Sequence, residues 1–156
     1  MKKALIIVAA SVVFLFIVIQ FFQPAKNDNP VNLQDDIAFK LAMPAAIKNK
    51  ITNACYDCHS NKTAYPFYNN FAPVSWMMAR HIHKGKEHLN FSEWATYERK
   101  QQVKLLAKIC DEIKAHEMPL KSYIIMHRNA RISEKELEEI CNWTEQASEQ
   151  VMGQKD

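Results

Sequence analysis

The sequence predicts a small all-α domain that follows an N-terminal apolar helix. The chain has 156 residues and only 2 are glycine, so few positions suit a hairpin-rich β fold or a glycine-rich phosphate loop. Apolar residues make up 48% of the chain, which is enough for a packed core and excludes a disordered tail. Beyond residue 43, apolar positions recur at helical spacing in several segments, as described below.

The N-terminus predicts a membrane anchor. Residues 4–22 are apolar except for Ser11 and Gln20, and about nineteen helical residues span about 28 Å, close to the thickness of the bilayer core. The run ends in two phenylalanines and Gln23-Pro24, which do not resemble the small-residue cleavage site of a signal peptide. A cleaved signal peptide remains the alternative, and it would export the rest of the chain as well.

The flanking charges predict the orientation. Lys2 and Lys3 precede the apolar run and favour a cytoplasmic N-terminus. We therefore expect a single-pass protein of a bacterial inner membrane, with lipid around residues 1–23 and the remainder in the periplasm. From Pro24 onward the chain carries 18 Lys and Arg against 17 Asp and Glu, a balance too even for a nucleic-acid partner.

The exported part divides into three segments. Residues 24–42 mix Asn, Asp, Gln and Lys with two prolines, which predicts a tether. Residues 43–150 form the helical domain, and residues 151–156 form a tail.

Helix signals then follow in order along the domain. Pro44 suits the first turn of a helix that runs into Cys55, and a loop follows over residues 61–70. Pro73 opens a second helix, for which Gly85 is a plausible C-terminal stop. Asn90 or Ser92 caps a short helix through residues 94–97.

Two longer helices complete the predicted domain. Apolar positions from Val103 to Ile113 share one helical stripe, which Pro119 forces to end by Met118. Residues 121–131 are expected to be irregular. Residues 133–136 match a capping box and begin the last helix.

The segment Cys55-Tyr56-Asp57-Cys58-His59 is the most specific motif in the chain. On a helical turn, the i and i+3 thiols lie on one side, where they can reach the two vinyl groups of a haem. The imidazole of the next residue can then bind the iron, and this spacing is the attachment signature of c-type haem. We therefore expect one covalent haem c on Cys55 and Cys58, with His59 as the proximal iron ligand.

Three other roles for the cysteine pair are less consistent with the sequence. A thioredoxin-type site would have a strand before the motif and a helix after it, whereas here a helix comes before and a loop after. A zinc site would need two more ligands in a compact pair, and Cys110 and Cys141 lie far apart in the sequence. A disulfide between Cys55 and Cys58 would close a strained ring.

A second axial ligand is expected from Met or His. Met118 is the leading candidate as distal iron ligand, because it lies just past a helix end and before Pro119. Other methionines fill cores without special roles. The rival ligands are His81, His83, His88, His116 and His127. An open sixth site is a third possibility.

The chain resembles the bacterial haem-binding-domain proteins with a single C-x-x-C-H motif, which are common in the Bacteroidota. The resemblance covers about residues 40–147 and rests on residues 54–61, 65–66, 68, 72–76, 81–82, 85, 88–94, 117–120, 123, 127 and 132–133. It implies covalent haem on the motif cysteines. The order of helix, motif, Met-Pro loop and final helix is also similar to class I cytochromes c, which implies a small cytochrome c-like domain whose first and last helices pack together.

These observations predict a membrane-anchored periplasmic monohaem cytochrome that carries single electrons and is not an enzyme. A gas or redox sensor with an open sixth iron site is the alternative, and a haem peroxidase is a further one that lacks an obvious Arg–His arrangement. Cys110 and Cys141 lie on apolar helix faces, either as small buried side chains or as a disulfide between the last two helices.

Overall fold

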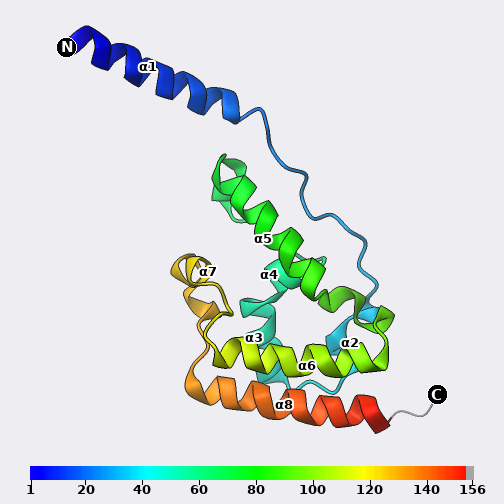
Figure 1. The fold of residues 1–156 in the computed structure, drawn as a ribbon. Coiled ribbons are helices and arrows are strands. Elements are labelled where there is room, and N and C mark those ends of the chain that lie inside the picture. Colours follow the sequence, from blue (N-terminus) through cyan, green and yellow to red (C-terminus); the bar gives the residue numbers. More distant parts are fainter. Residues whose placement is uncertain (154–156) are drawn as a thin grey trace.

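The computed structural model describes residues 1–153, and over these residues the chain is helical without any strand, which confirms the all-α prediction (Figure 1). The α-helices are α1 (Lys2–Ile19), α2 (Ile37–Lys40), α3 (Ala45–Ala54), α4 (Tyr56–His59), α5 (Val74–His88), α6 (Arg99–Lys114), α7 (Lys121–Met126) and α8 (Glu134–Gly153). The short 3-10 helices are η1 (Leu33–Asp35), η2 (Phe67–Asn70), η3 (Phe91–Thr96) and η4 (Arg128–Ala130).

The core forms around the α6–α8 pair, the most extensive helix contact in the fold. Apolar stripes from both helices meet there, and a disulfide joins Cys110 to Cys141 with a Cα–Cα distance of 5.0 Å. Helix α3 also contacts α8, as the cytochrome analogy implies for the first and last helices of the domain. The Trp143 indole N–H donates to the Ala42 carbonyl at 3.1 Å, which ties α8 to the chain that enters α3.

Local sequence signals place several helix ends as predicted. Pro44 is the N-cap of α3, and the Asn90 side chain accepts a hydrogen bond from the Ser92 N–H at the start of η3. Before α8, the Ser133 N–H and hydroxyl both donate to the Glu136 carboxylate at 2.8 Å, which confirms the capping box.

Two expectations about helix limits are wrong. Helix α5 does not stop at Gly85 but continues to His88. The glycine does not end the helix; it is needed for a close contact between helices that is described below. Residues 121–131 are not wholly irregular, since α7 and η4 form there without any side-chain cap.

The segment expected as a tether makes ordered contacts with the domain. It contains η1 and α2, and Ile37 and Leu41 are buried in the core. The Asn27 side chain donates to the Ser60 carbonyl and the Thr63 hydroxyl, so the chain is also held near the C-x-x-C-H motif. At the other end, α8 continues to Gly153, and residues 154–156 of the expected tail lie outside the described residues.

Candidate functional site

The C-x-x-C-H motif forms a separate helical turn between α3 and the following loop. Cys55 ends α3 and caps α4, and its carbonyl accepts hydrogen bonds from the N–H groups of Cys58 at 3.2 Å and His59 at 2.9 Å. This turn places both cysteines on the wall of one cavity, as free and partly buried thiols. The predicted geometry of the motif is therefore present.

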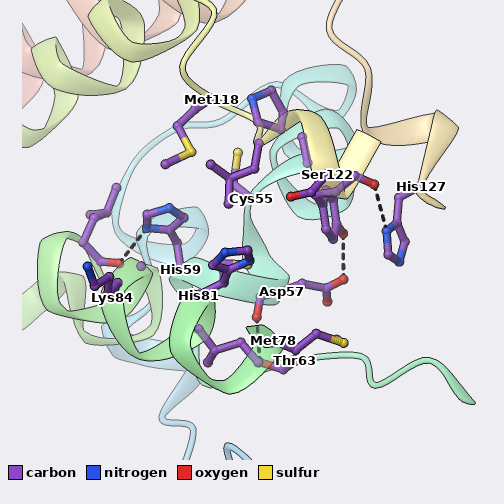
Figure 2. A pocket seen from close by; sticks show the side chains of 18 of the residues that line it. Cys55, Asp57, His59, Thr63, Met78, His81, Lys84, Met118, Ser122 and His127 are labelled. Carbon is purple, nitrogen blue, oxygen red and sulfur yellow. Dashed lines mark hydrogen bonds between the residues drawn. The ribbon is translucent and has the colours of Figure 1, made fainter. Parts of the chain in front are cut away.

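The cavity beside the motif has a volume of about 750 Å³, within the usual range for small-molecule and cofactor sites. Its walls come from the motif, from one face of α5, from the end of α6 and from α7. Most of the lining is apolar, with Leu, Ile, Val, Phe and Met side chains. Figure 2 shows Cys55, His59, His81 and Met118 among the side chains that line it.

A backbone carbonyl orients the His59 ring. Its Nδ1 lies 3.1 Å from the Leu89 carbonyl oxygen, and only a protonated Nδ1 can donate to that acceptor. The other ring nitrogen, Nε2, is therefore left with its lone pair. Burial lowers the pKa of His59, so the neutral form that metal binding requires is favoured. A ligating histidine with this kind of backbone partner is the usual arrangement at metal sites.

Gly85 brings α5 against the motif. A Cβ atom at this position would lie 2.5 Å from the Cys58 carbonyl oxygen and 3.2 Å from the Cys58 Cβ. Any other residue would push α5 away from α4, since both close atoms belong to the backbone or its first carbon. The glycine thus sets the distance between the motif and the opposite wall of the cavity.

The thiol environment does not suit a thiol–disulfide enzyme. Burial raises the pKa of Cys55 to about 12 and that of Cys58 to about 11, so both stay protonated at neutral pH. Reactive thiols have a lowered pKa instead. The disulfide between Cys110 and Cys141 removes those two as zinc ligands, and residues 1–153 contain no cluster of three or more His, Cys, Asp or Glu side chains suited to a metal ion.

Comparison with known proteins agrees with this site. The model of a family described as the haem-binding domain matches residues 14–146, which is most of the chain. The chain belongs to the haem-binding domain family. No curated protein and no solved structure gives a significant match to it.

Within this haem-binding domain, the structure narrows the candidates for a second iron ligand. Met118 lines the cavity, as do His81, His88 and His127. His83 lies outside the lining and pairs with Glu87 at 3.3 Å on the exposed face of α5. His116 is exposed and also lies outside the lining.

The end of α6 fixes the backbone that carries Met118. His116 has a left-handed conformation with φ of 55°, and its N–H donates to the Ile113 carbonyl at 3.0 Å. The N–H groups of Glu117 and Met118 both donate to the Glu112 carbonyl, at 3.1 and 3.2 Å. This is a Schellman-type helix ending, and the hydrogen bond from its backbone N–H holds Met118 at the cavity wall. Figure 2 shows the Met118 side chain entering the cavity on the side of His59.

Asp57 is a site residue that the sequence analysis missed. The Tyr123 hydroxyl donates to its carboxylate at 2.7 Å (dashed line at Asp57 in Figure 2). The Ala64 N–H donates to the same carboxylate at 2.9 Å. Burial and the hydrogen bond to Asp57 raise the pKa of Tyr123, so the phenol keeps its proton. The Tyr123 ring stacks on His127 with centroids 4.1 Å apart. Asp57, one of the two residues between the cysteines, therefore joins the motif to α7.

Proposed function

We propose that this haem-binding domain holds one haem c and carries single electrons. Cys55 and Cys58 are the covalent attachment points, His59 is the proximal iron ligand, and Met118 is the distal one. The observation that carries the proposal is the His59 ring, which lies on the wall of a cofactor-sized cavity with its Nδ1 hydrogen-bonded to the Leu89 carbonyl.

The cysteines fit the attachment chemistry. Each thiol would add across one vinyl group, with sulfur bonding to one carbon and hydrogen to the other, so a thioether would form without a leaving group or an oxidant. The two sulfurs are spaced by one helical turn, which matches two vinyl groups on the same edge of a porphyrin.

The remaining side chains support electron transfer more than catalysis. A bound haem supplies an iron that changes between two oxidation states by one electron. His59 on α4 and Met118 in the loop after α6 line the same cavity, and as two iron ligands they would leave no open iron position for a substrate. The apolar lining excludes water from the cofactor, and a methionine ligand favours a higher reduction potential than a second histidine.

The N-terminal helix supports a membrane location. Helix α1 has 18 residues, none of them buried, and is the single helix among residues 1–153 that is long and apolar enough to cross a membrane. A signal sequence can have the same length and composition, and it would also export the domain. The disulfide favours a compartment outside the cytoplasm in either case. The proposal is that α1 is retained as an anchor in the inner membrane, with the haem domain in the periplasm.

The test is the visible absorption spectrum of the full chain, exported in a host with haem-attachment machinery. We expect sharp low-spin c-type bands after reduction, haem that remains attached after denaturation, and a thioether-to-iron charge-transfer band in the oxidised protein. Folded protein without covalent haem would refute the proposal. High-spin bands and binding of carbon monoxide by the resting reduced protein would favour a sensor instead.

The distal ligand is tested by a matched pair of variants. Met118→Ala should keep the covalent haem but lose the charge-transfer band and lower the reduction potential, because a water or His ligand replaces sulfur. Met78→Ala removes another methionine that lines the same cavity and should keep the band. An unchanged spectrum in Met118→Ala would show that the assignment is wrong, and an altered one in His81→Ala would name the other ligand.

A further inference from the structure

An apolar surface surrounds the N-terminal end of α5. Phe67 on η2 has 79% of its surface exposed, and Phe71 in the following turn has 52%. Trp76 and Met77, in the first turn of α5, are 40% and 46% exposed. Four large apolar side chains within eleven residues make an interaction surface rather than scattered exposed positions.

Hydrogen bonds tie this surface to the end of α1. The Gln20 side chain accepts from the Ala72 N–H at 2.9 Å and donates to the Ala72 carbonyl at 3.1 Å. The Trp76 indole N–H donates to the Phe22 carbonyl at 2.6 Å. Figure 1 shows the N-terminal end of α5 next to the point where the chain leaves α1. The apolar surface is therefore hydrogen-bonded to the end of the apolar helix.

The position of α1 identifies the occupant of this surface. A helix that is apolar on all sides and wholly unburied is stable in a bilayer, and its C-terminal end then lies at the membrane–water interface. Phe21 and Phe22 continue the apolar run as exposed side chains into that region. Tryptophan and phenylalanine suit the interface, since the rings enter the apolar side while the indole N–H keeps a polar partner.

We propose that Phe67, Phe71, Trp76 and Met77, with Phe21 and Phe22, form a membrane-interface surface that holds the domain against the bilayer in which α1 is anchored. The proposal rests on the proposed function in one respect, the retention of α1. The occupant is the lipid surface itself. A second copy of the chain or a protein partner would not require the hydrogen bonds between this surface and the end of α1.

This arrangement gives the haem cavity a fixed orientation. Phe67 and Met77 line the cavity as well as the apolar surface, so one side of its rim faces the lipid. Exposed Lys84 and Lys108 also line it, farther along α5 and on α6. Lys108 pairs there with Glu112, which also lines the cavity, at 3.8 Å. The rim thus has an apolar side at the membrane and a charged side that faces water. A redox partner would approach from the charged side.

The experiment uses the full chain in phospholipid vesicles that contain a lipid with a diazirine group near its headgroup. After illumination, adducts are mapped by peptide mass spectrometry, a readout that does not depend on haem. We expect adducts on residues 67–77 in addition to those at the end of α1. Adducts confined to α1 would overturn the proposal.

A matched pair of variants gives the specificity control. Phe71→Glu should lose most adducts over residues 67–77 while α1 stays labelled, because a carboxylate is costly at the apolar side of the interface. Phe39→Glu alters a phenylalanine on α2 that is even more exposed, with 67% of its surface free, and should leave the adduct pattern unchanged. Equal adducts on residues 67–77 in wild type and Phe71→Glu would also overturn the proposal.

Intact mass and membrane fractionation test the retention of α1 separately from the interface surface. A soluble chain that lacks residues 1–22 would overturn both the anchor and the interface surface. A retained anchor without adducts on residues 67–77 would overturn the surface alone. Neither result bears on covalent haem, which the absorption spectrum measures independently.

Discussion

Replacement of Gly85 by alanine tests whether a close helix contact defines the haem site. In most helix interiors this change stabilises a protein by about 1 kcal/mol, because alanine loses less conformational entropy than glycine. At this position the added Cβ would lie 2.5 Å from the Cys58 carbonyl oxygen and 3.0 Å from the carbonyl carbon. Those atoms are backbone and cannot rotate away as a flexible side chain would.

The two effects oppose each other, and the steric one is larger. Overpacking of this kind costs about 1–3 kcal/mol, and relief of it requires α5 to move away from α4. After subtraction of the propensity gain, we expect Gly85→Ala to lower the free energy of unfolding by up to about 2 kcal/mol. The Leu89 N–H donates to the Gly85 carbonyl at 2.9 Å, and the Leu89 carbonyl holds His59, so the displacement reaches the proposed iron ligand.

The assay is thermal unfolding of the full chain in detergent, together with the yield of covalent haem. Gly153→Ala is the control, because nothing lies within 4 Å of a Cβ at that position near the end of α8. It should be neutral or slightly stabilising and should keep a normal haem yield. If Gly85→Ala proves as stable as wild type, with full haem incorporation, the close contact does not define the site.

Three other perturbations test separate parts of the fold. The paired change Cys110→Ser and Cys141→Ser opens a loop with a sequence separation of 31 and should cost about 3.7 kcal/mol in the chain-entropy model; denaturant unfolding that is unchanged would contradict it. Hydrogen bonds with Lys50 and Ser133 lower the pKa of Glu136 from 4.5 to about 2. The stabilising effect of the carboxylate is therefore present above pH 4.5 and is lost as the pH falls toward 2. Glu136→Gln should be less stable than wild type by under about 1 kcal/mol at neutral pH, and the stabilities of the two proteins should become equal in acid. Tyr123→Phe removes the hydroxyl that donates to Asp57 and should cost about 1–2 kcal/mol, whereas equal melting of both proteins would exclude a structural role.

Sequence patterns predicted the features that depend on neighbouring residues. The C-x-x-C-H spacing requires one helical turn, and the structure has that turn at α4. The Ser133–Glu136 capping box and the Pro44 helix start were also predictable, since each needs contacts over a few residues only. The apolar stripe that includes Cys110 identified α6, although whether this cysteine bonds to Cys141 was left open.

Features that depend on distant segments could not be predicted in this way. Gly85 resembled a helix stop in the sequence, but α5 continues past it. Its contact with Cys58, 27 positions earlier, explains why a glycine stands there. The partner of His59 is a backbone carbonyl at Leu89, which carries no side-chain signal. Helix α7 has no capping side chain, so local pattern gave no reason to expect it.

The structure assigns stability and the haem site to different helix contacts. The disulfide and the largest apolar contact lie between α6 and α8, while the motif depends on the α4–α5 contact at Gly85. The cavity needs both, because Met118 follows the end of α6 and His59 ends α4. Loss of the disulfide should therefore lower stability with little change in the absorption spectrum, whereas Gly85→Ala should change both. Similar spectral changes in the two variants would mean that the contacts are coupled more closely than their separate positions imply.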